Sequence, residues 1–115
     1  MADERRDRAL LLDMLTYAEE AQSIVSGRRY EVFLKDRIRV LALERALEVV
    51  GEAARNVTQE RKDATPDIPW KQINGQRNAL AHQYGDIDHF QLFRTASEDI
   101  PRLIGVLQRI LDRRP

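Results

Sequence analysis

The chain has 115 residues, 43% of them apolar, which is enough for one hydrophobic core and too apolar for a disordered chain. It contains no cysteine, which excludes a disulfide framework and a thiolate metal site. Its 19 basic and 19 acidic side chains give zero formal net charge, which argues against nonspecific nucleic-acid binding through excess positive charge. A surface that binds nucleic acid would therefore have to be a local positive patch.

Targeting and membrane signals are missing from the sequence. No apolar run approaches the length of a membrane span, and the N-terminal residues MADERRDR lack the apolar core of a signal peptide. We therefore expect a cytoplasmic protein without membrane association, in which residues 1–115 form one domain.

The first predicted helix runs from about Glu4 to Ser26. Gly27 is predicted to end it, because glycine adopts the left-handed conformation at little cost. Apolar residues recur at alternating four- and three-residue steps, which predicts one face packed in a helical bundle. This face comprises Leu10, Met14, Tyr17, Ala21 and Ile24.

The second predicted helix, roughly Glu31 to Gln59, is apolar on more than one side. A helix that needs so much cover packs either wholly within its own bundle or also against a partner, and the pattern leaves both open. Small residues such as Gly51 would let another helix approach closely. One stripe is Val40, Leu43, Leu47, Val50, Ala54 and Val57, and the second is Ile38, Ala42, Ala46, Val49 and Ala53.

A polar loop from Arg61 to Pro69 is expected to precede a short third helix that ends near residues 82–84, because Gly85 follows. The predicted core anchors of this helix are Trp70, Ile73 and Leu80.

The last predicted helix runs from about Asp88 to Asp112, capped by Asp86 or Asp88. At Pro101 we expect either a kink or a break and restart with Asp99 as the cap, because the apolar phase continues through the proline. The predicted fold class is all-α, a helical bundle of three long helices and one short one. The apolar phase of the last helix is Phe93, Ala96, Ile100, Leu103, Leu107 and Ile110.

The stretch QRNALAHQYGDID, residues 76–88, brings an arginine, an asparagine, a histidine and a tyrosine close together in sequence. On an ideal helix Arg77 and His82 lie about 140° apart, so they share no face while the helix continues. They can converge if the helix loosens after Ala81. They can also converge if a two-fold axis pairs two copies, which would place two arginines and two histidines around one groove.

These residue types suit RNA cleavage without a metal. Attack by the ribose 2′-hydroxyl, which leaves a 2′,3′-cyclic phosphate, requires a base, an acid and a cation that stabilises the phosphorane. His82 can serve as acid or base, since a helix C-terminus favours its protonated form, and Arg77 can supply the cation. Asn78 could orient His82 or bind phosphate. The structural alternative is that Arg77 pairs with Asp86 or Asp88 while His82 caps the helix.

The segment RNALAHQY resembles the R-x-x-x-x-H-x-Y signature of the HepT-like family in the HEPN superfamily, whose ribonuclease motif is R-N-x-x-x-H. DRIRVLALERALEVVGEAA is similar to the family's long second helix, and IPWKQINGQRN to its lead-in to the motif. The resemblance extends from about Leu10 to Leu111. It implies a HEPN-like bundle in which Arg77 and His82 are the catalytic pair and Asn78 supports them, with no metal and no cofactor.

The resemblance also implies partners. It points to the toxin of a HepT/MntA-type toxin–antitoxin pair, a homodimeric, metal-independent endoribonuclease. The MntA-type antitoxin is a nucleotidyltransferase that adenylylates (AMPylates) the motif tyrosine, which here is Tyr84. An alternative function is a non-catalytic helical dimer that binds a nucleotidyltransferase partner or a nucleotide.

Other candidates are weaker. His89 could be a second acid or base, although a surface histidine in a first helical turn is commoner. A metal site from His82, Asp86, Asp88 and His89 is conceivable, but adjacent donors on a turn point in different directions. The densest basic group could line an approach for RNA or form a solvated face, and it comprises Arg28, Arg29, Lys35, Arg37 and Arg39.

Overall fold

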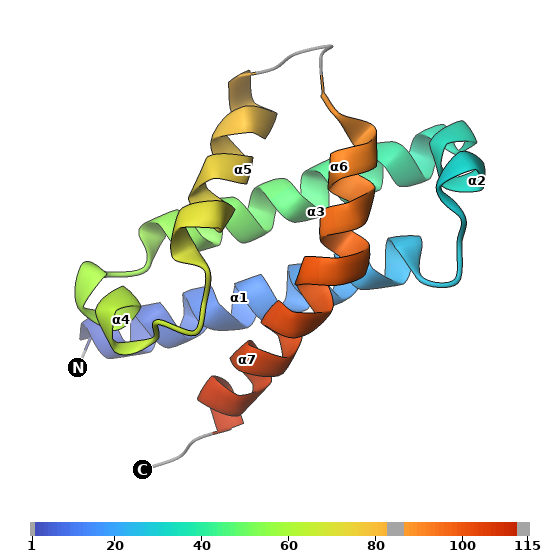
Figure 1. The fold of residues 1–115 in the computed structure, drawn as a ribbon. Coiled ribbons are helices and arrows are strands. Elements are labelled where there is room, and N and C mark those ends of the chain that lie inside the picture. The colour runs from blue at the N-terminus through green and yellow to red at the C-terminus, as the bar shows by residue number, and fades with distance from the viewer. Residues whose placement is uncertain (1, 83–86, 113–115) are drawn as a thin grey trace.

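The computed structural model describes residues 2–82 and 87–112, except for the side chains of residues 81 and 82. Every element in these ranges is helical, so the predicted all-α bundle is confirmed (Figure 1). No described helix combines the length and apolar character needed to cross a membrane. The elements are α1 (Ala2–Val25), α2 (Tyr30–Lys35), α3 (Arg37–Asn56), α4 (Gln59–Ala64), α5 (Trp70–His82), α6 (His89–Arg94), the π-helical turn η1 (Thr95–Asp99) and α7 (Ile100–Asp112).

The two longest helices, α1 and α3, pack against each other, and α7 packs against α1. The short helix α5 packs on α3, while α6, η1 and α7 follow one another as a single run (Figure 1). In Figure 1, α5 and α6 are separate from each other where they cross α3. The helix that carries Arg77 is therefore positioned mainly by α3.

The predicted buried face of α1 is confirmed at Met14 and Ala21 and is wrong by one residue at its other three positions. Leu10, Tyr17 and Ile24 are only half-buried, because the run Leu10–Leu12 is apolar throughout and fits several helical phases. Gly27 follows the helix with φ of 70°, which confirms it as the C-terminal stop. The residues that α1 buries are Asp7, Leu11, Met14, Ala18, Ala21 and Val25.

The predicted second helix is divided into three, because two polar residues act as N-caps within it. The Asp36 side chain accepts a hydrogen bond from the Arg39 N–H at 3.2 Å and starts α3. The Thr58 hydroxyl accepts one from the Arg61 N–H at 3.2 Å and starts α4, so the expected loop from Arg61 was wrong at its beginning.

The first predicted stripe of this region is confirmed, since all six of its residues are buried. The second stripe is covered only in part. Ala46 and Ala53 are buried, Val49 is half-buried, and Ala42 and Ile38 are exposed, Ile38 to 80%. The bundle of one chain therefore leaves one face of α3 uncovered near its N-terminal end.

A buried carboxylate ties α1 to the start of α4. Asp7 is only 5% exposed, and its two oxygens accept hydrogen bonds from the Thr58 N–H at 3.0 Å and the Thr58 hydroxyl at 2.6 Å. We predict that Asp7→Ala lowers the free energy of unfolding by about 1–3 kcal/mol, because it leaves these donors without their acceptor. Urea denaturation measures the loss. The exposed Asp13→Ala on the same helix is the control, expected within about 0.5 kcal/mol of wild type. Equal losses in both variants would contradict the role assigned to Asp7.

An aromatic cluster that periodicity did not reveal joins α2 to α6. The ring of Tyr30 lies 5.0 Å from that of Phe90 and 5.6 Å from that of Phe93, and Phe33 lies 5.2 Å from Phe93. Phe33 is 1% exposed. The cluster therefore fixes the start of the C-terminal helical run.

Pro101 neither breaks nor restarts the last helix, so the expected restart at Asp99 was wrong. The chain instead widens into η1, where the Ile100 N–H donates to the Thr95 carbonyl oxygen five residues earlier. A π-helical turn moves the preceding carbonyls, which relieves the clash that a proline ring causes inside an α-helix. The predicted cap Asp88 is confirmed, since its carboxylate accepts from the Gln91 N–H at 3.0 Å.

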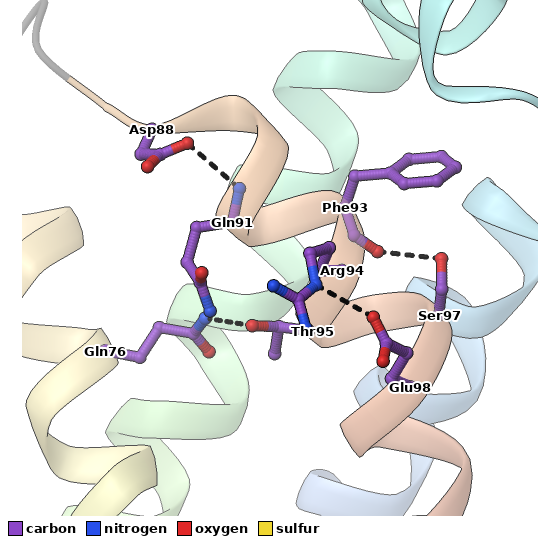
Figure 2. Close-up of polar contacts among 8 residues, drawn as sticks. All are labelled: Gln76, Asp88, Gln91, Phe93, Arg94, Thr95, Ser97 and Glu98. Atoms are coloured by element: carbon purple, nitrogen blue, oxygen red, sulfur yellow. Dashed lines mark hydrogen bonds and ion pairs between the residues drawn. The ribbon is translucent and has the colours of Figure 1, made fainter.

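Two exposed side-chain bonds support the widened turn (Figure 2). The Ser97 hydroxyl donates to the Phe93 carbonyl oxygen at 2.8 Å, and Arg94 Nε donates to Glu98 Oε2 at 2.9 Å. The hydrogen bond from Arg94 and the charge of its guanidinium hold the pKa of the Glu98 carboxyl below its usual value. Both groups are exposed, so the pair contributes little to stability.

Candidate functional site

The N-terminal end of α5 is anchored by the loop before it. The Trp70 indole donates from Nε1 to the Thr65 carbonyl oxygen at 3.1 Å, and the Ile73 N–H donates to the Pro69 carbonyl oxygen. Of the predicted anchors, Leu80 is buried, while Trp70 and Ile73 are half-buried. Ile68, which is 2% exposed, is an anchor that the helical pattern missed because it lies outside the helix.

Arg77 packs directly on the backbone of α3 at Gly51. A Cβ added to Gly51 would lie 2.4 Å from the Cβ and 2.7 Å from the Cγ of Arg77. Only a glycine lets α5 approach this closely. The close helix approach expected at Gly51 therefore occurs within the chain, and it positions the candidate catalytic arginine.

We predict that Gly51→Ala lowers the free energy of unfolding by about 1–3 kcal/mol, because the added methyl group must push Arg77 and α5 away. RNA cleavage should fall with it. Gly75→Ala in α5 is the matched control, since its Cβ would meet no atom within 4 Å. It is expected to gain about 0.5–1 kcal/mol from lost backbone freedom in the unfolded chain. Urea denaturation compares the two, and parallel changes would contradict the packing argument.

The Arg77 guanidinium is half-buried and carries no partner carboxylate among the described residues. Its Nη1 donates to Asn78 Oδ1 at 3.2 Å, and its Nε is buried without a hydrogen-bond partner. The alternative pairing with Asp88 is not observed, since Asp88 caps α6, and Asp86 lies outside the described residues. The guanidinium therefore keeps N–H donors for an anion such as a phosphate.

The backbone of α5 stays helical through His82, so the helix does not loosen directly after Ala81. At about 100° per residue, position 82 lies on a different face of α5 from Arg77. One chain therefore does not place Arg77 and position 82 on the same face of α5. The exposed Asn78 lies beside Arg77, whereas the side chain of His82 and all of Tyr84 lie outside the described residues.

The weaker candidates take structural roles where they are described. His89 Nε2 lies 3.0 Å from Glu44 Oε2 and joins α6 to α3. Two of the four side chains considered for a metal site therefore have other partners, since His89 pairs with Glu44 and Asp88 caps α6. The other two lie outside the described residues. In the basic group, Arg39 bonds Asp36 at 3.3 Å, while Arg28, Arg29, Lys35 and Arg37 are exposed.

An all-α bundle that carries Arg77, Asn78 and His82 on one short helix defines a HEPN-like helical protein. The chain belongs to the HepT-like family, since the family model described as "Ribonuclease HepT-like" matches residues 14–110.

Curated relatives agree with this assignment. The chain is 38% identical over 107 residues to "Probable ribonuclease HepT" of Thermococcus cleftensis, covering 93% of this chain and 97% of the relative. It is 34% identical over 100 residues to "Putative RNase MJ1380" of Methanocaldococcus jannaschii, covering 86% and 92%. It is also 34% identical over 89 residues to "Putative RNase TTE0752" of Caldanaerobacter subterraneus, covering 77% and 80%. No solved structure matches the chain.

Proposed function

We propose that this protein is a cytoplasmic ribonuclease toxin that cleaves RNA without a metal, as a homodimer, through Arg77 and His82. The observation that carries the proposal is Arg77, held on Gly51 beside Asn78 and left without a partner carboxylate among the described residues. A cation fixed in this way is preorganised for a phosphate, which is the charge-stabilising element that phosphodiester cleavage requires. The ribonuclease names of the relatives point to the same substrate.

The proposed reaction uses two side chains. The His82 imidazole removes the proton from a ribose 2′-hydroxyl, and the 2′-oxygen attacks the adjacent phosphorus. The bond to the 5′-oxygen then breaks, and the imidazolium returns the proton to that oxygen, which leaves a 2′,3′-cyclic phosphate and a 5′-hydroxyl. The Arg77 guanidinium stabilises the negative charge on the phosphorane, and Asn78 holds one of its N–H groups.

The course of α5 supports the proposed homodimer. Because α5 is helical through His82, Arg77 and position 82 of one chain lie on different faces. A two-fold axis that pairs two α5 helices would bring Arg77 of one copy to His82 of the other, twice per dimer. The partly uncovered second stripe of α3 offers apolar surface for such a contact, including the 80%-exposed Ile38.

The direct test is incubation of the purified protein with total RNA in EDTA, followed by analysis of the product ends. We expect cleavage that leaves 2′,3′-cyclic phosphate and 5′-hydroxyl ends. Mass spectrometry of the same sample reports whether Tyr84 is unmodified. An unmodified protein that cleaves no RNA would overturn the proposal and favour the non-catalytic dimer that binds a nucleotidyltransferase.

The second part of the proposal is neutralisation by an MntA-type nucleotidyltransferase that adenylylates Tyr84. Tyr84 follows His82 by two residues, so an adenylyl group there would add bulk and phosphate charge beside the site and compete with the RNA phosphate.

We predict that Tyr84→Phe keeps RNA cleavage but is no longer silenced by the nucleotidyltransferase and ATP, because the acceptor oxygen is missing. Intact-mass measurement and RNA cleavage after the modification reaction are the two readouts. Tyr17→Phe is the control, expected to gain adenylyl groups and lose cleavage as the wild type does. Silencing of Tyr84→Phe with an unchanged mass would indicate neutralisation by binding alone.

A further inference from the structure

A pocket of about 350 Å³ lies beside the motif helix, between α5 and the run formed by α6, η1 and α7. The floor of the pocket is apolar and buried. It is contributed by α3, α5 and α7 through residues that include Leu47, Val50, Leu80 and Leu103. Its volume lies in the range of sites that bind small molecules. Neither the catalytic pair nor the reaction proposed above uses it.

The rim of this pocket is polar and carries no basic side chain among the residues that line it. Gln72 and Gln91 contribute amides, and Asp88 and Asp99 contribute carboxylates, all four on exposed residues. Neutral amides and carboxylates do not favour a phosphate, but they can pair with the donors and acceptors on the edge of a nucleobase.

Two amides from opposite walls line the pocket (Figure 2). Gln76 of α5 donates from Nε2 to the Thr95 hydroxyl of η1 at 3.0 Å. Figure 2 shows the Gln91 side chain extending from α6 toward the same Gln76 amide. The next residue after Gln76 is Arg77, so the pocket and the proposed phosphate-binding cation are carried by neighbouring positions of one helix.

We propose that this pocket binds one nucleobase of the RNA substrate, next to the phosphate that is cleaved. The inference rests on the proposed ribonuclease function and adds a base-binding subsite to it. Single-stranded RNA presents unstacked nucleobases. Their apolar faces suit the buried floor of the pocket, and their polar edges suit its rim. The Asp99 carboxylate and the Asp88 oxygen that does not cap α6 are acceptors suited to the exocyclic amino groups of adenine, cytosine and guanine, which uracil lacks, so uracil is expected to bind more weakly.

The test combines nucleoside binding with mapping of cleavage sites. Each of the four free nucleosides is titrated into the full-length protein and followed by ¹H–¹⁵N NMR. Cleavage sites of wild type and variants are mapped on total RNA. Ala79→Leu fills the pocket from α5 while keeping a good helix former, and Gln91→Ala removes a rim amide. Gln108→Ala, an exposed residue of α7 outside the pocket, is the matched control.

We expect adenosine, cytidine and guanosine to shift resonances of the residues that line the pocket, with uridine binding about tenfold more weakly or worse. Ala79→Leu should abolish these shifts and lower kcat/KM for RNA about tenfold or more. Gln91→Ala should weaken the base preference at one position beside the cleaved bond. Gln108→Ala should match the wild type in all three measurements.

Three results would overturn the base-binding pocket. The first is the absence of nucleoside shifts in the pocket of the wild type. The second is an Ala79→Leu variant that cleaves the same sites with wild-type efficiency. The third is an Ala79→Leu variant that weakens dimerisation without altering base preference. That result would mean that the pocket binds a side chain of a second copy. Should the wild type cleave no RNA, the ribonuclease proposal fails by itself, and the nucleoside titration alone decides the pocket.

Discussion

His82→Ala is expected to reduce RNA cleavage by about 10²–10⁴-fold, the loss typical of removing a general acid–base group. The variant should keep its fold, because the residues that hold α5 on the bundle, Leu80 and the contact of Arg77 with Gly51, are unchanged. Cleavage is measured on total RNA in EDTA, and folding by circular dichroism and thermal unfolding.

The chain provides a matched control, because it contains one other histidine, His89. His89 pairs with Glu44 between α6 and α3, away from the proposed chemistry. His89→Ala should therefore retain cleavage and lose only a little stability. A folded His82→Ala protein that cleaves as fast as the wild type would reject His82 as the acid–base group. Equal losses in both variants would mean that histidine substitution acts through stability.

Mixed dimers of Arg77→Ala and His82→Ala are expected to regain about half of the wild-type cleavage, although each variant alone is inactive. If every site joins Arg77 of one copy to His82 of the other, one of the two sites in a mixed dimer contains both native residues. The other site contains neither. The two variants are co-produced with different tags, and the mixed dimers are purified through both tags in sequence.

This result depends on the geometry of α5. If Arg77 and His82 of the same chain acted together, no site in a mixed dimer would hold both residues, and purification through both tags would recover no cleavage. Absence of recovery would therefore contradict the site shared between copies. The negative control is Arg77→Ala mixed with Arg77→Ala/His82→Ala, since neither copy in that dimer carries Arg77.

The sequence alone determined the helical class and most of the buried face of the central helix. The stripe Val40, Leu43, Leu47, Val50, Ala54 and Val57 repeats with the helical period, and all six residues are buried. The stop at Gly27 and the cap at Asp88 were also predicted, because each depends on a residue with a strong local conformational preference. Arg77, Asn78 and His82 were predicted as site residues from the resemblance of RNALAHQY to the HepT-like signature, and their roles in cleavage are part of the proposal.

Where local and periodic signals compete, the sequence was ambiguous. Residues 31–59 were predicted as one helix, yet the Asp36 side chain caps α3 and the Asp36 backbone N–H ends α2 on the Phe33 carbonyl oxygen. Thr58 caps α4 near the end of the same predicted helix, and its capping role is reinforced by Asp7, a residue 51 positions away. Pro101 is accommodated by a π-helical turn, which no hydrophobic pattern specifies. These outcomes depend on hydrogen bonds that either interpretation of the sequence would allow.

Only the tertiary structure decided which residues meet between distant segments. The contact of Gly51 with Arg77 joins α3 to α5, and the pocket beside α5 is closed by α3, α6 and α7. Both depend on how helices cross, and crossing is set by side-chain packing over the whole bundle rather than by the period of any one helix. The sequence therefore specified the helices and the chemical groups, whereas packing decided which arginine is held rigidly and which groups share a pocket.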